Sequence, residues 1–378
     1  MSSLQVIDVS AQYGKRTALK ETNLRVENGQ FCVIVGPAGA GKTTLLNVIA
    51  GIKRPSAGHV YFDDQEVTEV PTWDRNVAMV FENYALYPHL TVFENLASPL
   101  RRLKYPRDRL EHIVRETAAL LGIDRLLSQL PAHISNGQRQ RVAIGRAIVR
   151  PSHILLMDEP LAHLDAKIAG TMRLELKKLQ QRLRRTVVYV THEYREALSL
   201  ADWLVVLENG QILQSGTPRE VFYGPVNLRV ARMFGNPPRN LLMGRMTQES
   251  GRWRFQIAGE EARIEFGRCV GHEKLGDRDV ALGVLPGDID LEISTDTPGE
   301  VGSRPGTVLR VRIAAVEPQG LRNLIVAELG KQRLQFFTKA AIRPRSGEIV
   351  PIRLRLHRAM LFDQNTGGRI ATGQEVMV

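Results

Sequence analysis

Cysteine is scarce in this sequence, with only Cys32 and Cys269 among 378 residues. Two cysteines cannot build a disulfide framework and are too few for a zinc site based on thiolates. Cys32 lies in an apolar stretch, so we expect it to be buried as a small hydrophobic residue.

Long hydrophobic runs are also missing. No segment approaches the roughly 18 consecutive apolar residues that indicate a membrane-spanning helix. The opening MSSLQVIDVS has no basic region followed by a long apolar one, so it does not resemble a secretory signal. We expect a cytoplasmic protein that does not span a membrane.

Acidic residues are outnumbered by basic ones, 40 to 51, which gives a formal net charge of +11. This excess is compatible with a nucleic-acid partner, an anionic membrane surface or no specific partner. Several arginines alternate with apolar residues, as on the solvated face of a strand: Arg310, Arg312, Arg353 and Arg355. The charge alone is therefore weak evidence for any partner.

The most informative stretch is residues 31–51, FCVIVGPAGAGKTTLLNVIAG. Its apolar, β-branched beginning predicts a buried strand, and the apolar residues after the glycines recur at helical spacing. Gly36, Gly41, Lys42 and Thr43 match the phosphate-loop pattern. In that pattern backbone N–H groups surround phosphates, the lysine reaches the β- and γ-phosphates and the hydroxyl binds magnesium. The stretch predicts a nucleotide site between a strand and a helix N-terminus.

Two later strands are predicted to end in ionisable groups. HILLMDEP, residues 153–160, ends in Asp158 and Glu159, and TVVYVTHE, residues 186–193, contains His192. Ligands of α/β proteins bind at the carboxyl ends of strands, so we expect these groups at one rim. Tyr13, beside a turn, is compatible with stacking on an adenine or with covering a hydrophobic edge.

Other segments predict the surrounding architecture. Helices are expected over 109–121, over the amphipathic segment that follows Ser135, and over 166–183. Residues 202–217 predict a hairpin turning at Asn209-Gly210. The proline-rich GNPPRN, residues 235–240, predicts a linker, and short alternating strands after it predict a small β-barrel or sandwich.

The ordered set of the phosphate loop, ENYALYPH, SNGQRQ, LLMDEP, HLDA and TH resembles the ATP-binding subunits of ABC transporters over essentially the whole chain. YALYPHLTVFEN, LDAK and a β-rich C-terminal half are most similar to the ATPase subunits of sugar and polyol importers. Importers of polyamines, sulfate or iron share much of the pattern. The resemblance implies an α/β P-loop NTPase domain over 1–235, with a mixed sheet core, an antiparallel β subdomain and a helical subdomain at about 84–150. An OB-like all-β regulatory domain would occupy 236–378.

The resemblance also implies roles for single residues. Tyr13 would stack on adenine, and Asp165 would assist communication between subunits. The catalytic groups would be Glu159, His192, Lys42 and Glu82, and Mg²⁺ would be held by Thr43, Asp158 and Glu82. The phosphates of ATP would be surrounded by the loop residues Gly36, Pro37, Ala38, Gly39, Ala40, Gly41, Lys42, Thr43 and Thr44.

Partners follow from the same resemblance. Family members work as pairs, so Ser135, Asn136, Gly137 and Gln138 would contact the nucleotide of a second ATPase subunit. Residues 84–89 would contact transmembrane permease subunits, placing the chain on the cytoplasmic side of the inner membrane. A periplasmic or extracellular solute-binding protein would act indirectly, and a regulatory protein would bind the C-terminal domain. No nucleic-acid partner is expected.

Four residues depart from the family pattern: Glu82 replaces a glutamine, Asn136 replaces the first glycine of S-G-G-Q, His163 precedes Asp165, and Leu285 replaces an arginine. A carboxylate at 82 adds negative charge near the γ-phosphate, and a side chain at 136 crowds a phosphate. We hypothesise that the chain pairs with a different ATPase subunit. A homodimer that tolerates these substitutions is the alternative.

Two other functions compete with import. A soluble ABC ATPase acting on nucleic acid would fit the basic charge, but such proteins usually join two cassettes or carry coiled coils, and neither is seen here. A purely regulatory protein with ATP as a structural ligand would not need the Asp158-Glu159 pair.

Overall fold

The computed structural model describes residues 2–162, 164–249, 252–266, 276–292 and 307–372. His163, singled out above, lies outside the described residues. The chain divides into two compact units, residues 1–221 and 222–378. The division falls within α7 (Pro218–Tyr223). The assignment of 1–235 and 236–378 as functional domains stays a prediction.

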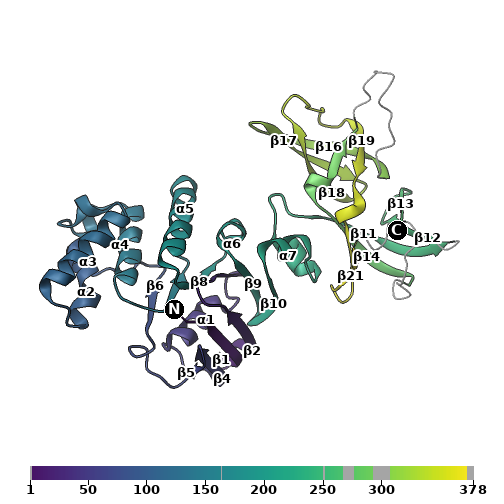
Figure 1. The fold of residues 1–378 in the computed structure, drawn as a ribbon. Coiled ribbons are helices and arrows are strands. Elements are labelled where there is room, and N and C mark those ends of the chain that lie inside the picture. The colour runs from purple at the N-terminus through teal and green to yellow at the C-terminus, as the bar shows by residue number, and fades with distance from the viewer. Residues whose placement is uncertain (1, 163, 250–251, 267–275, 293–306, 373–378) are drawn as a thin grey trace. The chain divides into compact units, whose positions relative to one another are not determined.

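The first unit contains two sheets (Figure 1). The antiparallel sheet has the order β2 (Arg16–Val26), β1 (Leu4–Tyr13), β4 (Ala57–Phe62) and β5 (Gln65–Glu66). The larger sheet has the order β10 (Gln211–Gly216), β9 (Trp203–Glu208), β3 (Phe31–Val35), β8 (Thr186–Thr191), β7 (Ile154–Asp158) and β6 (Val77–Val80). Its strands are parallel except β10.

Both sheets and the helix α1 (Lys42–Ala50) share one hydrophobic core. Leu45, Leu46 and Ile49 of α1 are fully buried, as are all five residues of β3. A strand covered on both faces has no polar alternation, which explains the continuous apolar run of residues 31–35. Cys32 is buried within this core, as expected, and burial raises the pKa of its thiol.

The helices α2 (Val92–Arg102), α3 (Arg107–Leu120) and α4 (Asn136–Ile148) form the predicted helical subdomain, and Figure 1 shows them gathered together. Capping boxes at Thr91 and Ser135 begin α2 and α4 by satisfying N-terminal N–H groups. The other helices of the unit are α5 (Ala166–Leu183) and α6 (Tyr194–Leu200). The expected helix over 166–183 and the hairpin at Asn209-Gly210 are confirmed.

The side chain of Asn95 in α2 forms hydrogen bonds with the segment that precedes this helix. Its fully buried amide accepts a hydrogen bond from the backbone nitrogen of Tyr87 at 2.9 Å. It also donates to the carbonyls of Tyr87 at 3.1 Å, Leu90 at 3.0 Å and Thr91 at 3.0 Å. One side chain thus bonds to four backbone groups, although the carbonyls of Tyr87 and Thr91 also accept from the backbone nitrogens of Leu90 at 3.2 Å and Asn95 at 2.9 Å.

Replacing Asn95 by alanine should therefore lower the free energy of unfolding by about 2 kcal/mol, because the Tyr87 N–H and the Leu90 carbonyl lose the hydrogen bonds that Asn95 gives them. Denaturant titration of the full-length protein measures this change. The matched control is Asn23→Ala, since the exposed Asn23 bonds only with Asp8 and Glu21 at the surface, and its effect should stay within about 0.5 kcal/mol. Equal effects of the two substitutions would contradict the assignment.

The second unit contains α8 (Leu228–Met233) and two antiparallel sheets. One has the order β13 (Arg263–Glu265), β12 (Arg252–Ile257), β11 (Asn240–Glu249), β14 (Arg278–Val284), β20 (Met360–Asp363) and β21 (Arg369–Thr372). The other has the order β15 (Ile289–Leu291), β19 (Ile349–Leu354), β16 (Thr307–Gln319), β17 (Arg322–Leu329) and β18 (Gln332–Lys339).

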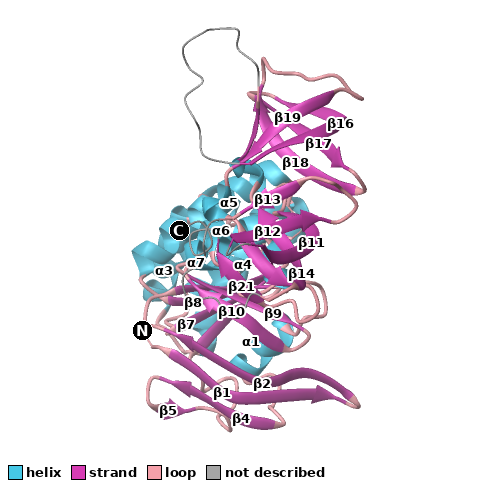
Figure 2. Cartoon of the chain, turned by 90° about the vertical axis from the view of Figure 1, so that its right-hand side faces the viewer, coloured by secondary structure: helices cyan, strands magenta, loops and turns pink. Residues whose placement is uncertain are grey.

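A single hydrophobic cluster joins the two sheets of this unit, and Figure 2 shows them as a region of strands. Alternation along β16 is clear: Leu309, Val311 and Ile313 are buried, whereas Arg310 and Arg312 are exposed. Arg353 pairs with Glu292, and Arg355 pairs with Asp290 at 3.1 Å. The prediction of a solvated strand face is confirmed for Arg310 and Arg312, whereas Arg353 is half-buried on β19 and Arg355 lies just beyond that strand. Leu285 is buried at the end of β14.

Candidate nucleotide site

The phosphate loop joins β3 to α1 and surrounds an open cavity of about 830 Å³ within the first unit. The whole loop from Pro37 to Thr44 lines this cavity. Glycine is required at two of its positions. A Cβ on Gly36 would lie 2.0 Å from the carbonyl oxygen of Leu207. Gly41 has a left-handed φ of 106°, and a Cβ there would lie 2.6 Å from the carbonyl oxygen of Ala18. The loop therefore keeps its tight turn only with these glycines.

Lys42 lies at the centre of the loop and is 5% exposed. Its Nζ donates to the carbonyl of Gly36 at 3.0 Å and to that of Pro37 at 3.1 Å. It also lies 3.4 Å from Oε1 of Glu159. The ammonium is thus held at the N-terminus of α1, where the helix dipole also favours an anion.

The carboxyl ends of β3, β8 and β7 are adjacent because these strands are neighbours in the sheet. Asp158 is the last residue of β7, and Glu159 turns away from the strand with a left-handed φ of 41°. The Glu159 N–H still donates to the carbonyl of Val190 on β8 at 3.1 Å. His192 follows β8 and brings Nδ1 to 2.5 Å from Oε2 of Glu159. The structure therefore brings together Lys42, Glu159 and His192, all from separate segments.

The oxygens suited to a magnesium ion form a second group. Thr43 Oγ1 donates to Oδ1 of Asp158 at 3.1 Å. Burial, together with the charges of Glu159 and Glu82, raises the pKa of Asp158, while Thr43 and Lys42 act in the other direction. Hydroxyl and carboxylate oxygens in a site short of positive charge fit Mg²⁺, which needs only one or two carboxylates when phosphates and waters complete its shell. Among the described residues no cluster of three metal-binding side chains occurs, so phosphate oxygens would have to take part.

Asp158 therefore lowers the stability of the nucleotide-free protein. Its pKa is raised on folding, so its favourable contribution exists below the unfolded pKa of about 3.9 and is lost as pH rises through the folded pKa. Asp158→Asn should raise the thermal midpoint at about pH 7.5, with a smaller gain at about pH 4.5. A matched control, Asp202→Asn, removes a carboxylate that pairs with Lys177 at 2.7 Å and should not stabilise. A gain for Asp158→Asn that is independent of pH would contradict this reasoning.

The remaining predicted residues lie in three places. Tyr13 and Glu82 line the same cavity as the phosphate loop, and Tyr13 is 49% exposed with Lys53 Nζ 4.6 Å from its ring centroid. Ser135, Asn136, Gly137 and Gln138 begin α4 and do not line this cavity. Asp165 is the N-cap of α5 and accepts from the backbone nitrogens of Lys167 and Ile168. The first group joins the site, whereas the nucleotide-binding role expected of the α4 residues stays a prediction.

Asn136 does not need the conformation of a glycine. It is the first residue of α4 and has no left-handed φ. Its Oδ1 accepts from Arg139 at 3.4 Å. The backbone therefore accepts asparagine here without strain, and only the bulk of the side chain distinguishes it from glycine.

Sequence reasoning missed Arg16. It belongs to β2 and lines the cavity together with Tyr13, and its Nη2 lies 3.4 Å from where a Cβ on Gly39 would be. A guanidinium over the loop adds a second cation to the site. The sequence does place Arg16 three residues after Tyr13, in the same predicted turn, and this proximity could have indicated that both residues face the nucleotide.

Fold and site together define a P-loop nucleotide-binding protein of the ATP-binding-cassette class. A family model described as ABC transporter matches residues 19–162. A trehalose/maltose import ATP-binding protein from Thermococcus litoralis is 38% identical over 382 residues, covering 98% of this chain and 100% of its own. An sn-glycerol-3-phosphate import ATP-binding protein from Escherichia coli K12 is 40% identical over 371 residues, again covering 98% and 100%. The chain therefore belongs to the ATP-binding proteins of ABC transporters.

Solved structures agree with this assignment. A dimeric ATP-binding cassette in a post-hydrolysis state, bound to ADP and phosphate, has 31% identity and a TM-score of 0.52, covering 57% of this chain and 99% of its own. Part of an ABC transporter complex from Clostridium perfringens has 27% identity and a TM-score of 0.55, covering 58% and 90%. The predicted fold class, the ATPase activity and the resemblance to sugar and polyol importer subunits are confirmed. No helix in the described ranges is long and apolar enough to cross a bilayer.

Proposed function

We propose that this chain is the ATP-hydrolysing subunit of an importer for a sugar, polyol or sugar phosphate. The contact of Glu159 with both Lys42 and His192 at the mouth of the phosphate loop supports hydrolysis over mere binding. Relatives named for trehalose/maltose and for sn-glycerol 3-phosphate support the solute class. Polyamines, sulfate and iron are the alternative solutes.

The residues divide the work of hydrolysis as follows. Tyr13 stacks on the adenine, and the N–H groups of loop residues 38–44 together with Lys42 bind the phosphates. Thr43, Asp158 and Glu82 would hold Mg²⁺, which would supply positive charge against the phosphates. Glu159 orients the attacking water and accepts its proton, and His192 fixes the Glu159 carboxylate. Positioning and electrostatics thus do most of the work, as phosphoryl transfer requires.

The assembled transporter tests the solute. The chain should be purified with its permease subunits and solute-binding protein in proteoliposomes, and ATP turnover measured as each solute is added: maltose, trehalose, glycerol, glycerol 3-phosphate, spermidine, sulfate and ferric iron. Stimulation by one of the first four supports the proposal. Stimulation by spermidine, sulfate or iron instead would assign one of the alternatives, and no turnover would refute hydrolysis.

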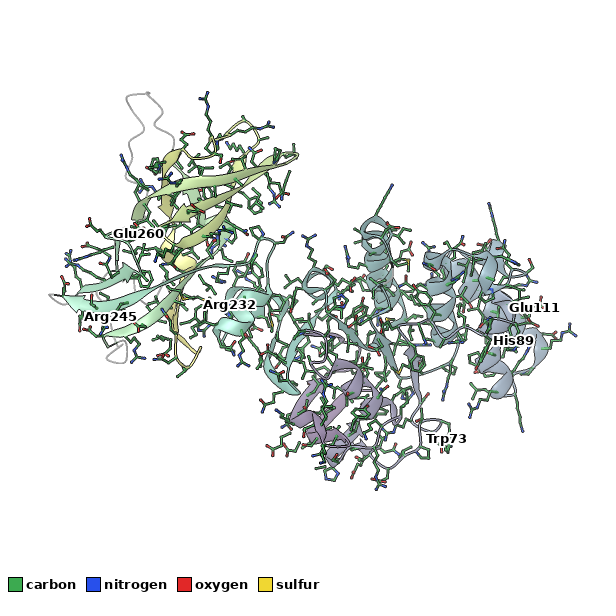
Figure 3. The ribbon with its side chains drawn as sticks, turned by 180° about the vertical axis from the view of Figure 1, so that it is seen from behind. Trp73, His89, Glu111, Arg232, Arg245 and Glu260 are labelled. Carbon is green, nitrogen blue, oxygen red and sulfur yellow. The ribbon has the colours of Figure 1, made fainter. Side chains whose placement is uncertain are left out.

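The proposed partner surface for the permease is a cavity of about 560 Å³ in the first unit. Exposed apolar side chains line it, notably Trp73 at 62%, Tyr87 at 47% and Leu103 at 44% exposure. Figure 3 shows Trp73 projecting from the surface of this unit and His89 beside the helices. Exposed aromatic side chains beside Pro88 favour a contact surface, on the cytoplasmic side of the membrane.

The α4 residues Ser135 to Gln138 would complete the ATP site of a second ATPase subunit. The dimeric cassette found among similar structures supports pairing. We keep the hypothesis that the second subunit is a different chain, because Glu82 and Asn136 depart from the family pattern. Purification of the assembled transporter with a single ATPase polypeptide would refute it. Unchanged turnover after Asn136→Gly combined with Glu82→Gln would show that both departures are neutral.

Regulation is proposed for the β-rich part of the second unit, from residue 236 onward. Its two sheets form their own hydrophobic core, so this unit presents a folded surface of its own to a regulator. The test is whether the full-length chain captures a regulator from solution. Substitution of exposed residues of this unit should abolish that capture.

A further inference from the structure

The segment that follows Glu82 carries two strained residues. Tyr84 has φ of 62° and Ala85 has φ of 46°, so both occupy the left-handed region. Residues other than glycine, asparagine and aspartate rarely adopt this conformation, and it persists only where surrounding contacts enforce it. Two such residues in succession require an external restraint.

Arg146 supplies that restraint. Its guanidinium donates to the carbonyl of Ala85 at 2.6 Å and to the carbonyl of Tyr84 at 3.1 Å. The guanidinium carbon also lies 5.3 Å from the ring centroid of Tyr87, a cation–π contact. In the described part of the chain no carboxylate pairs with it, so its planar fork is committed to this segment.

Arg146 is itself held by a rigid element. It lies in the last turn of α4, next to Gly145, where a Cβ would come within 2.6 Å of Leu96 and 3.0 Å of Leu121. At Gly145, α4 packs closely against these two leucine side chains. Arg146 therefore reaches the carbonyls of Tyr84 and Ala85 from a closely packed helix.

We propose that Arg146 is a positioning residue for ATP hydrolysis, which holds the backbone two and three residues beyond Glu82 and thereby places the Glu82 carboxylate in the nucleotide cavity. This inference rests on the proposed function, because it assumes that Glu82 serves magnesium and the attacking water. Glu82 lines the cavity together with Lys42 and Glu159, which is the geometry the restraint preserves.

A double-mutant cycle tests the inference in the full-length chain, assembled with its permease where turnover requires it. Arg146→Ala should lower kcat by about tenfold, since small displacements of a reacting group cost up to about 100-fold, while KM for ATP changes less than about twofold. Glu82→Ala should change kcat by about fivefold or more alone, but by less than about twofold in the Arg146→Ala background, because Arg146 acts on turnover through the position of the Glu82 carboxylate. The Mg²⁺ concentration for half-maximal rate should rise in Arg146→Ala.

Controls separate positioning from stability. Arg25→Ala removes an exposed guanidinium of β2 that pairs with Glu27 at 2.6 Å and lines neither the nucleotide cavity nor the proposed permease surface, and its kcat should match the wild type. Arg146→Lys keeps the charge but not the two-pronged fork, so it should resemble Arg146→Ala. The proposal is overturned if Glu82→Ala has the same effect in both backgrounds, or if lysine restores kcat fully. Absence of turnover in the wild type would instead refute the proposed function.

Discussion

Glu159→Gln is expected to reduce ATP turnover by about 10²–10⁴-fold, the contribution typical of a positioned general base. The side chain is 16% exposed and lies between Lys42 and His192, so an amide of the same shape should fit without disturbing the loop. The amide cannot accept the proton of the attacking water. ATP binding should be retained, and should tighten, because Lys42 loses a competing carboxylate.

Single-turnover hydrolysis and equilibrium binding of ATP, measured on the same preparation, separate these effects. Glu193→Gln is the matched control, because Glu193 is exposed and outside the cavity, and it should hydrolyse ATP at the wild-type rate. Turnover of Glu159→Gln within about twofold of the wild type would remove Glu159 from the mechanism.

Lys42→Met is expected to weaken ATP binding by about 10- to 100-fold. The ammonium is buried and its hydrogen bonds go to two loop carbonyls, so it is already aimed at the place where phosphates bind. A hydrogen bond to a charged group contributes about 1.5–3 kcal/mol, and each 1.4 kcal/mol is a factor of about ten in affinity. Hydrolysis should be lost together with binding.

Calorimetric titration with ATP and Mg²⁺ measures this loss. Lys20→Met is the control, because Lys20 is exposed on β2 and does not line the cavity, and its affinity should equal that of the wild type. If Lys42→Met binds ATP as tightly as the control, the phosphates must be held by the loop N–H groups and Arg16 instead.

Most of the site was predictable because its signals are local. The phosphate loop, the acidic end of 153–160 and His192 each follow a buried strand, and parallel neighbours bring such ends together. The contact between Glu159 and His192 could be anticipated in outline, but the left-handed turn at Glu159 could not. It depends on a hydrogen bond to Val190 on another strand.

Other residues carry no local signal. Arg16 becomes part of the site only because β2 lies over the loop, and Arg146 and Asn95 act on a segment far from them in sequence. In the sequence, both residues look like the polar residues that amphipathic helices commonly expose to solvent. Only tertiary packing reveals that each restrains backbone.

Neighbouring segments hold the phosphate loop in place, and this affects how the free energy of ATP binding can be used. Besides the close contact of Gly36 with Leu207, the Gly210 N–H donates to the Ala40 carbonyl at 2.9 Å, so contacts from neighbouring strands fix the loop before any nucleotide arrives. A preformed cradle loses little conformational entropy when it binds. The free energy released by ATP is then available for rearranging less tightly held parts, such as subunit contacts, and that is what a transport motor must accomplish.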